Sequence, residues 1–510
     1  MKKNSMMIAA MAGALIALTG ACRDTSRFDE EYPLPTPEQP GDDQSKPDQP
    51  VSSNYSETYR PQIHYTPSAN WINDPNGMVK VGDTYHLFYQ YNPSGNDWGN
   101  MSWGHATSTD MIHWKEQTVA LRRDDLGDIF SGSCVVDKNN TAGFGKDAVI
   151  AFYTSSGTTQ QQSMAYSTDG GMTFTKYEAN PVIANTSMPD FRDPKVFWDE
   201  ARSKWVMCLA KGWTYGIEFW SSSDLKSWTR MSEFTSPIER CNKGQWECPD
   251  LLKMTYNGAE KWVLLVSVNP GGPAGGSGTM YFVGDFDGTE FVADTLDYPL
   301  WMDYGTDNYA GVTWSNTGDR HLLIGWMNNW NYAGAVPASP WRSAMTLPRE
   351  LKLIELDGKP LLASTVPAEI ESICGEWQPV TGRLPEADSY RIRLTVDLTA
   401  NRTFTLSNDS GEKLEFEVKG GARKLIAKRN AATGKADFNG SFSLPAIQAP
   451  LNCDGESVEL EIYVDRSSVE VFTANGSMSM TAIVFPNSIY NIVTAGDGVS
   501  AEVSSMSRIW

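Results

Sequence analysis

At 510 residues the chain is long enough to form two domains, and its apolar fraction of 40% is sufficient for real hydrophobic cores. The formal net charge of −20 argues against a nucleic-acid partner, because phosphate binding requires clusters of Lys and Arg and the sequence has none. A neutral partner fits better. The 18 Trp offer flat faces that suit neutral rings, although most are expected to pack in cores.

Residues 1–21 are predicted to be a signal peptide. Lys2 and Lys3 precede an apolar run of thirteen residues, 6–18, which is too short to cross a bilayer. The stretch "LTGAC" at its end resembles a bacterial lipoprotein cleavage box, in which Cys22 becomes the lipidated first residue. Because Leu18 lies four places before Cys22 rather than the usual three, ordinary cleavage is the alternative.

Residues 22–58 are predicted to be a tether. This segment is acidic and contains six Pro, a composition that cannot bury a core and favours an extended chain. The N-terminus therefore predicts an exported bacterial envelope lipoprotein, periplasmic or on the cell surface. Its contact with the membrane is expected only through a lipid on Cys22.

The remaining Cys and His residues predict neither a disulfide framework nor a metal site. Six cysteines follow Cys22 at irregular spacing without a C-x-x-C pair, so most are expected to be buried thiols. The five His are scattered and form no H-E-x-x-H motif, and we expect no metal and no cofactor. There is no G-x-S-x-G nucleophile elbow, and the Gly-rich stretch 270–278 lacks the Lys of a phosphate-binding loop.

A repeat with a period near 60 residues predicts a β-propeller over residues 59–355. Four stretches combine a short strand, a turn containing Asp and then an aromatic residue. Their aspartates are Asp110, Asp169, Asp224 and Asp287, which lie 59, 55 and 63 residues apart. Each period holds about four short apolar strands, so the segment accounts for five blades. A β-sandwich is the alternative for this region.

The period fails after "LPRELKLIE", and residues 367–510 read as a separate β-sandwich. Alternating strands such as "YRIRLTVDL" and "VELEIYVDRSSVEVFT" are separated by turn signals every ten or so residues. No helix of normal length with a 3.6-residue period follows the signal peptide. The fold class is therefore predicted to be all-β, a five-bladed β-propeller followed by a C-terminal β-sandwich.

Three acidic motifs lie where blades are expected to begin: "WINDPNG" (71–77), "DFRDPKVFW" (190–198) and "WECPDLL" (246–252). Each places a carboxylate beside Pro, just before an apolar strand. Singly, each reads as a turn or strand cap. Because the first strands of propeller blades surround one axis, the three together predict carboxylates that converge at one mouth.

With "QYNP" (90–93), "FSGS" (130–133), "DYGTDNYAG" (303–311) and "SPWRSAMTLPREL" (339–351), these motifs resemble the β-fructosidases of glycoside hydrolase family 32. The likeness extends from His64 to Phe485 and includes "VDRSSVEVF" in the predicted sandwich. The resemblance implies a five-bladed propeller with a β-sandwich. It also implies hydrolysis of β-fructosidic bonds in fructans or sucrose with retention of configuration.

By this resemblance Asp74 is the nucleophile, Glu247 the general acid/base, and Asp193 the residue that holds ring hydroxyls and stabilises the transition state. The chemistry agrees, since an oxocarbenium-like transition state needs one carboxylate beneath the sugar and one acid beside the leaving oxygen. Two neighbouring carboxylates should raise the pKa of Glu247. Arg192 is expected to keep a neighbouring carboxylate ionised and to bind a hydroxyl; a structural ion pair is the alternative.

The resemblance also implies a pocket for one terminal fructose. The turn-forming residues of "WINDPNG" are expected to end the approach of the chain at the propeller mouth and to aim Asp74 into it. Amide and hydroxyl groups would bind the sugar, and aromatic side chains would wall the pocket or stack on the ring. The substrate-binding set is Trp71, Asn73, Gln90, Trp98, Phe130, Ser131, Arg192 and Trp330.

Several functions remain open from the sequence. Residues 128–145 and 324–351 look more like exo-acting than endo-acting family members, so release of single fructose units is favoured over an endo-acting levanase or inulinase. A fructosyltransferase on the same scaffold is a second alternative. A non-catalytic sugar-binding lipoprotein is a third, disfavoured because binding alone does not need three carboxylates. A five-bladed family that acts on arabinans fits the "WINDPNG" motif less well.

Overall fold

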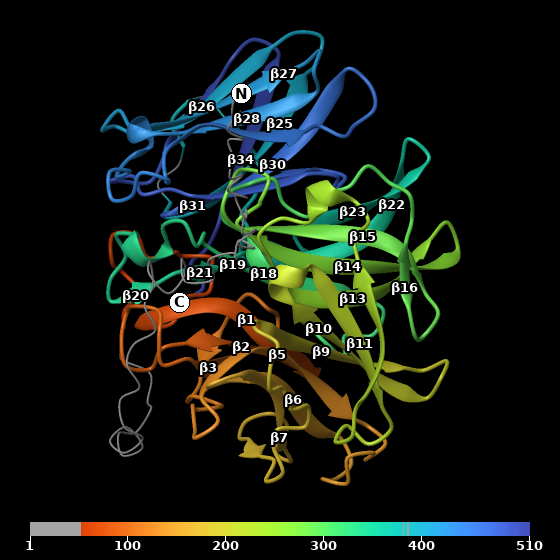
Figure 1. The fold of residues 1–510 in the computed structure, drawn as a ribbon. Coiled ribbons are helices and arrows are strands. Elements are labelled where there is room, and N and C mark those ends of the chain that lie inside the picture. The colour runs from red at the N-terminus through yellow and green to blue at the C-terminus, as the bar shows by residue number, and fades with distance from the viewer. Residues whose placement is uncertain (1–52, 381, 385–386) are drawn as a thin grey trace, which may run out of the picture. The chain divides into compact units, whose positions relative to one another are not determined.

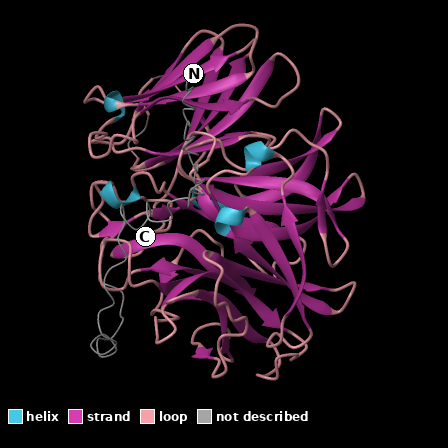
Figure 2. Ribbon diagram, in the orientation of Figure 1, coloured by secondary structure: helices cyan, strands magenta, loops and turns pink. Residues whose placement is uncertain are grey.

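The structure is a computed structural model that describes residues 53–380, 382–384 and 387–510. The predicted signal peptide, Cys22 and most of the predicted tether lie outside these residues. Strands dominate the described chain (Figure 2), which contains no α-helix, and the all-β fold class is confirmed. The described helices are short 3-10 turns: η1 (Gly212–Thr214), η2 (Glu239–Cys241), η3 (Ala333–Ala335), η4 (Ala368–Ile373) and η5 (Ala431–Thr433).

Apart from β20, the first twenty-three strands form five antiparallel sheets, named blades 1 to 5 (Figure 1). Blade 1 contains β1 (Asn70–Val81), β2 (Thr84–Tyr91), β3 (Ser102–Ser108) and β4 (Lys115–Glu116). Blade 2 contains β5 (Asp128–Asp137), β6 (Ala148–Ser156), β7 (Gln160–Ser167) and β8 (Thr175–Lys176). Blade 3 contains β9 (Phe191–Asp199), β10 (Lys204–Lys211), β11 (Gly216–Ser222) and β12 (Thr229–Thr235).

Blades 4 and 5 carry short additional strands. Blade 4 contains β13 (Gln245–Tyr256), β14 (Ala259–Asn269), β15 (Gly278–Phe286), β16 (Phe291–Ala293) and β17 (Leu300–Trp301). Blade 5 contains β18 (Tyr309–Thr313), β19 (His321–Met327), β21 (Ala344–Met345), β22 (Arg349–Leu356) and β23 (Lys359–Thr365). The first strands β1, β5, β9, β13 and β18 contact one another in that order, and β18 contacts β1. This closed ring is the centre of a five-bladed propeller, as predicted.

The repeated aspartates cap the turn between the third and fourth strands of blades 1 to 4. Asp110 Oδ1, for example, accepts hydrogen bonds from the backbone N–H groups of Ile112 at 2.9 Å and His113 at 2.8 Å. Asp169, Asp224 and Asp287 accept equivalent backbone hydrogen bonds. An Asx turn of this kind fixes a tight hairpin, which explains the period of the repeat.

In blade 5 a two-residue turn also joins the third and fourth strands, β22 and β23, but before β22 the chain leaves the sheet after β19. It forms β20 (Trp341–Arg342), which pairs in parallel with the start of β1, through Asn70 with Trp341 and Trp71 with Arg342. The last blade is thereby joined to the first. The excursion lengthens the spacing, which is why the repeat is lost in the sequence here.

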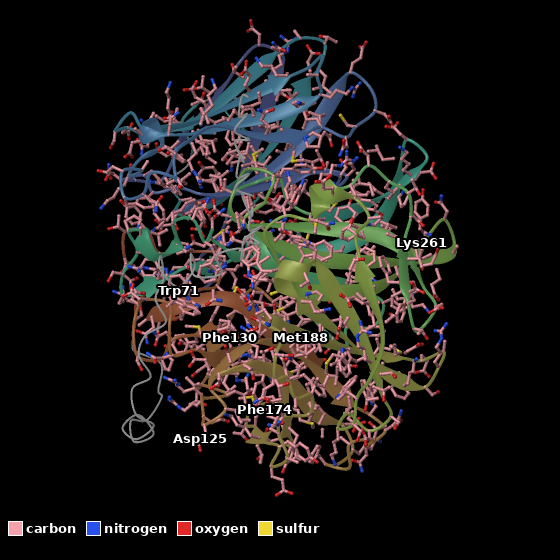
Figure 3. All side chains as sticks on the ribbon, in the orientation of Figure 1. Trp71, Asp125, Phe130, Phe174, Met188 and Lys261 are labelled. Atoms are coloured by element: carbon pink, nitrogen blue, oxygen red, sulfur yellow. The ribbon has the colours of Figure 1, made fainter. Side chains whose placement is uncertain are left out.

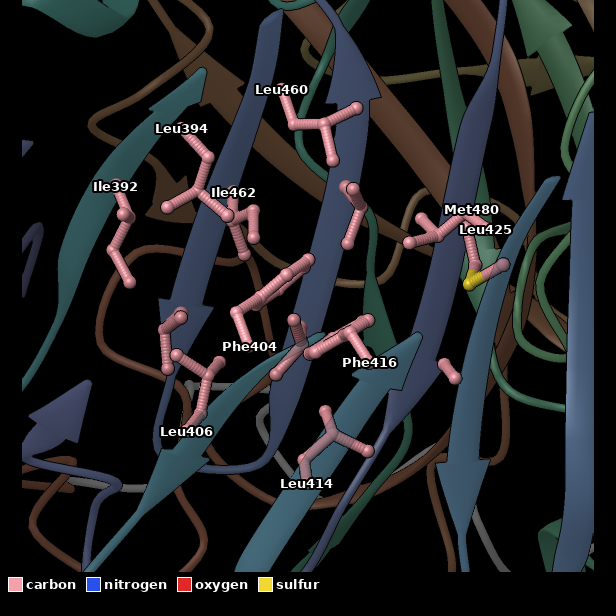
Figure 4. Close-up of a cluster of buried hydrophobic side chains, with 14 of the residues drawn as sticks. Ile392, Leu394, Phe404, Leu406, Leu414, Phe416, Leu425, Leu460, Ile462 and Met480 are labelled. Carbon is pink, nitrogen blue, oxygen red and sulfur yellow. The ribbon is translucent and has the colours of Figure 1, made fainter. Parts of the chain in front are cut away.

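The strands after β23 form a β-sandwich. One sheet has the order β24 (Gln378–Pro379), β34 (Val499–Ser505), β25 (Tyr390–Asp397), β30 (Ser457–Asp465), β31 (Ser468–Thr473), β32 (Ser479–Ile483). The other has the order β29 (Leu444–Pro450), β28 (Lys424–Arg429), β27 (Lys413–Lys419), β26 (Arg402–Ser407), β33 (Ile492–Ala495). Alternate residues point inward, and Figure 4 shows Leu394 and Ile462 of one sheet with Phe404 and Phe416 of the other.

Buried ion pairs join the propeller strands to the sandwich. His64 lies between Asp465, 2.8 Å from Nδ1, and Glu470, 2.9 Å from Nε2. Burial opposes a charge on His64, but the hydrogen bonds to both carboxylates raise its pKa to about 9. Glu470 also pairs with Arg349, at the start of β22. These contacts hold the sandwich strands β30 and β31 against His64, which precedes β1, and against Arg349 in blade 5.

The six described cysteines are free thiols, and four of them are buried, as the sequence predicts: Cys134, Cys208, Cys241 and Cys248. Among the described residues, the helices fall well short of the length and apolar character needed to cross a bilayer.

Candidate active site

The innermost strand of every blade carries a β-bulge at the same level. In each pairing of a first strand with a second strand, two consecutive residues of the first lie opposite one residue of the second. The bulged pairs are 73–74, 130–131, 193–194, 248–249 and 310–311. A bulge interrupts the alternation of a strand and redirects its side chains. The ring therefore presents side chains from all five blades at one level.

Three of these bulges require unusual backbone conformations. Asp193 has φ +65°, Cys248 φ +47° and Ala310 φ +52°. Residues other than Gly adopt this left-handed region rarely, at a cost of about 1–3 kcal/mol, and such positions cluster at functional sites.

The structure brings the three predicted catalytic carboxylates together around Cys248. The Cys248 Sγ lies 3.6 Å from Asp74 Oδ2 on β1 and 3.6 Å from Asp193 Oδ2 on β9. The backbone N–H of Cys248 donates to Asp193 Oδ2 at 2.9 Å. Glu247 precedes Cys248 in β13, so carboxylates from blades 1, 3 and 4 share one site.

Asp74 is held by its neighbours as a hydrogen-bond acceptor. Ser131 Oγ donates to Asp74 Oδ2 at 2.6 Å, and Asn73 Nδ2 donates to Asp74 Oδ1 at 3.1 Å. The side chain of Asn76 donates to the backbone carbonyl of Asp74. The residue remains partly exposed, so an oriented carboxylate faces the open side of the ring.

Glu247 lies between a cation and a phenol. Arg192 donates to Glu247 Oε1 from Nε at 3.2 Å and from Nη2 at 2.9 Å, and the Tyr309 hydroxyl donates to Oε2. Burial raises the pKa of Glu247, and the nearby charge of Asp74 raises it further, against the lowering effect of Arg192 and Tyr309. The net rise has the direction that the sequence predicts for a general acid.

Asp193 is the most buried of the three carboxylates, with 5% of its surface exposed. Burial raises its pKa to about 7, and the charges of Glu247 and Asp74 add to the rise, although Arg192 opposes it. Its backbone N–H donates to Thr154 Oγ1 at 3.0 Å, which ties the bulge of blade 3 to blade 2.

Arg192 acts on a different carboxylate from its sequence neighbour. Its Nε lies 4.0 Å from Asp193 Oδ2, whereas its hydrogen bonds go to Glu247 and, from Nη1, to Asp190 at 2.7 Å and Gln160 at 3.1 Å. Its guanidinium thus bridges blades 2, 3 and 4. The sequence predicts that Arg192 pairs with a neighbouring carboxylate, and in the structure Arg192 donates hydrogen bonds to that of Glu247.

The three aromatic residues Trp98, Phe130 and Trp330, predicted to wall the pocket, are half-buried. Trp98, Phe130 and Trp330 pack on the same hydrophobic cluster as Cys248 and Tyr309. Figure 3 labels Phe130 near the centre of the ribbon. The rings of Trp98 and Phe130 meet edge to face with centroids 6.2 Å apart. Their role as a pocket wall stays a prediction.

Trp71 differs from its expected place, because it is fully buried and no face of its ring is open to a ligand. Its indole stacks on Trp330 with centroids 5.9 Å apart, and its Nε1 donates to Asn73 Oδ1 at 2.8 Å. The prediction that Trp71 stacks on a sugar is therefore wrong. Trp71 instead supports Trp330 and Asn73 from behind. Burial of this large ring follows from its place in the innermost strand.

Gln90 lies opposite the bulge that carries Asn73 and Asp74, and it is buried. Its Nε2 donates to the carbonyl of Ile129 at 2.9 Å and to Asn76 Oδ1 at 3.3 Å. It thereby links the bulges of blades 1 and 2. Residues 270–277 of the Gly-rich stretch form the loop between β14 and β15, as expected.

The motif "WINDPNG" does not form a turn, contrary to the sequence expectation. It lies inside β1, with register shifts between Ile72 and Pro75 and between Asn76 and Val79. Gly77 has φ +53°, and a Cβ there would lie 2.6 Å from Trp103 and 2.8 Å from Phe88. The residues that usually break a strand here form bulges within it.

Sequence reasoning did not assign Tyr309 and Cys248 to the site. Both lie in motifs that carry the family resemblance, "DYGTDNYAG" and "WECPDLL", and membership of these motifs is the sequence feature that indicates them. Among the described residues no group of three or more His, Cys, Asp or Glu has the arrangement of a metal site. The chemistry at hand is that of paired carboxylates with a cation, a phenol and aromatic walls.

Comparison with known proteins identifies the family. The model "Glycosyl hydrolases family 32 N-terminal domain" matches residues 64–364, and "Glycosyl hydrolases family 32 C terminal" matches residues 370–508. The chain is 44% identical to the levanase of Bacillus subtilis, with 90% of this chain and 72% of that protein covered. It is 40% identical to an extracellular exo-inulinase of Aspergillus niger, with 90% and 96% covered. The crystal structure of exo-inulinase from Aspergillus awamori superposes with a TM-score of 0.82 at 36% identity, covering 90% of this chain and 100% of that one. The chain therefore belongs to glycoside hydrolase family 32 and is a glycoside hydrolase.

Proposed function

We propose that this enzyme releases terminal β-fructofuranosyl units from fructans and from sucrose, with retention of configuration. The observation that carries the proposal is the convergence of Asp74, Asp193 and Glu247, from three blades, around Cys248. The relatives named levanase and exo-inulinase support fructans as the substrate class.

The surroundings of the two reacting carboxylates support their roles. The Asp74 carboxylate, oriented by Ser131 and Asn73, attacks C2 of fructose, while Glu247 gives its proton to the leaving oxygen. The C2–oxygen bond breaks and a fructosyl ester on Asp74 forms. Glu247, now ionised, takes a proton from water, which attacks C2 and releases fructose.

Asp193 and Arg192 complete the proposed pocket. With a pKa of about 7, Asp193 exists as carboxyl and carboxylate near neutral pH, so it serves as donor or acceptor to a sugar hydroxyl. Arg192 and Tyr309 orient Glu247. Trp98, Phe130 and Trp330 wall the pocket, while Asn73, Gln90 and Ser131 supply polar groups at or just behind its surface.

An exo mode follows from the buried polar groups. Arg192, Asp193 and Ser131 are each at most 8% exposed. Each of them already has a partner within the protein, as Ser131 has in Asp74 and Arg192 in Glu247, so a further hydrogen bond comes only from a sugar that enters fully among them. The end unit of a chain can enter in this way, whereas a chain running through the site cannot. Such a site binds the end unit rather than the bond beyond it, so activity on both inulin and levan is expected.

The test is to incubate the purified enzyme with sucrose, inulin and levan and to separate the products over time. Free fructose should accumulate from the first samples while the polymer shortens slowly. Early fructo-oligosaccharides with little fructose would show an endo-acting enzyme. Growth of oligosaccharides longer than the substrate, with little free fructose, would show a transferase.

We infer that the enzyme is exported and propose that it is held at the envelope by a lipid on Cys22. The similarity to an extracellular exo-inulinase supports export. The anchor rests on the "LTGAC" box and on the acidic, Pro-rich residues 22–58, which would keep the catalytic domains away from the membrane.

A further inference from the structure

A buried ion pair lies on the ring directly below the candidate active site. Lys195 Nζ is 2.9 Å from Asp250 Oδ2, with 8% of Lys195 and none of Asp250 exposed. Thr313, on β18, binds both partners. Its carbonyl and Oγ1 accept from Lys195 Nζ at 2.7 and 3.1 Å, and its N–H and Oγ1 donate to Asp250 Oδ2 at 2.8 and 2.7 Å.

The two charges occupy equivalent positions in neighbouring blades. Lys195 is the first residue after the bulge of β9, paired with Cys208, and Asp250 is the first after the bulge of β13, paired with Leu265. The corresponding residues of blades 1, 2 and 5 are Pro75, Gly132 and Val312, which are uncharged. The charged pair is therefore confined to the blades that carry Asp193 and Glu247.

Contacts between side chains, rather than backbone hydrogen bonds, fix the position of one blade relative to the next along the propeller axis. The blades are separate sheets, so β9 and β13 share no backbone pairing. The bridges from β9 to β13 near the site are Arg192 to Glu247, Asp193 to Cys248, and Lys195 to Asp250. The first two involve carboxylates that must change charge or partners during the reaction. Lys195 and Asp250 take no part in the proposed chemistry.

A small cavity lies between Lys195 and the site. It is lined from all five inner strands, by Asp193 and Cys248 at the site and by Lys195 below them, among others. A shift of β13 relative to β9 along the propeller axis would thus move Glu247 away from both Arg192 and Asp193. Catalytic side chains must be held within about 0.5 Å of their reactive positions for efficient catalysis.

We propose that the Lys195–Asp250 pair, clasped by Thr313, is a positioning device that fixes the bulges of blades 3, 4 and 5 so that Asp193, Glu247 and Tyr309 meet in reactive geometry. The inference rests on the proposed function. Lys195 and Asp250 are positioning residues, since neither contacts the reacting atoms. Asp250, the second acid of "WECPDLL", thereby has a role distinct from that of Glu247.

The test removes both charges and asks whether stability and catalysis separate. In Lys195→Met/Asp250→Asn the amide oxygen at 250 still accepts from Thr313, and no buried charge is left unpaired. The matched control is Lys261→Met/Asp294→Asn, which removes a 2.8 Å lysine–aspartate pair from blade 4. Lys261 is labelled in Figure 3 at the outer edge of the ribbon, well away from Phe130.

We expect the double variant to melt within a few degrees of the wild type, to lose at least 30-fold in kcat on sucrose, and to change KM less than threefold. Its kcat/KM profile should shift in pH, because Glu247 and Asp193 no longer sit at fixed distances. The control should keep kcat within twofold. A folded double variant with kcat within threefold of the wild type would overturn the proposal.

A milder variant decides the matter if the double variant fails to fold. Thr313→Val keeps both charges and the side-chain size but removes the Oγ1 bridge. We expect kcat to fall three- to tenfold with KM unchanged, and wild-type kcat in this variant would reject the positioning role. Turnover of sucrose by the wild-type enzyme in the same assay distinguishes the two proposals. If the wild type does not cleave sucrose, the proposed function fails, whatever the variants show.

Discussion

The guanidinium of Arg192 lies 2.9 Å from the carboxylate of Glu247, although the two residues belong to different blades and are 55 positions apart in the chain. On the opposite oxygen, Tyr309 of a third blade donates a hydrogen bond. Glu247 is therefore held from both sides while its burial and the charge of Asp74 raise its pKa. A proton donor with a fixed direction is the result.

Asp74→Asn and Glu247→Gln should each lower kcat on sucrose by about three orders of magnitude or more, because each removes a reacting carboxylate. Melting temperature should change little, since both amides are nearly isosteric. Asp125→Asn, in an exposed loop, is the matched control and should retain full activity. In Glu247→Ala, azide should restore turnover of a substrate with an activated leaving group. Near-normal fructan turnover by either amide variant would remove that residue from its role.

Tyr309→Phe should move the basic limb of the kcat/KM profile to higher pH. The hydroxyl stabilises ionised Glu247, so its loss raises the pKa of Glu247 further. Activity should also fall by about tenfold, as is usual when a hydrogen bond to a charged group is lost. Tyr298→Phe removes a 3.0 Å hydrogen bond to the carbonyl of Val283 elsewhere in blade 4 and should leave the limb unmoved. An unchanged or acid-shifted limb in Tyr309→Phe contradicts the assignment.

Asp193→Asn should be inactive yet more stable than the wild type at pH 8. The folded-state pKa of Asp193 is about 7, against 3.8 for an ordinary carboxyl, so its favourable contribution is complete below pH 3.8 and is lost as pH rises through 7. The neutral amide avoids this loss, which reaches at most roughly 4 kcal/mol. Urea unfolding at pH 4 and pH 8 measures it. Parallel changes in the two proteins would show that Asp193 does not carry a raised pKa.

Cys22→Ala should release the enzyme from the membrane fraction or leave it unprocessed. The wild type should need detergent for extraction and should carry the mass of attached lipid. Recovery of unlipidated wild type in a soluble fraction without detergent would reject the anchor, without affecting the catalytic proposal.

The sequence was sufficient to predict the all-β class, the five blades and the meeting of the three carboxylates, because each depends on short sequence patterns within single blades. The capping aspartates recur once in each of blades 1 to 4, and the acidic motifs lie in the inner strands. Family resemblance then ordered their roles.

The bulges and the partners of buried charges could not be predicted in the same way. A bulge is a property of two strands in register, and a single sequence does not show that residues 73–74 lie opposite Gln90. Likewise, the partner of Arg192 is set by blade packing rather than by its neighbour Asp193. Trp71 was placed on the pocket surface because apolar rings suit sugars, but the innermost strand buries it completely.

The stereochemistry of transfer tests the central claim most directly. If Asp74 forms a fructosyl ester, hydrolysis of sucrose in water containing methanol must proceed through two inversions at C2, and methanol will capture the intermediate from the original face. Proton and carbon NMR of the early products should then show methyl β-fructofuranoside beside fructose. Methyl α-fructofuranoside as the first transfer product would contradict the account, because it requires direct displacement by the acceptor without a covalent intermediate on Asp74.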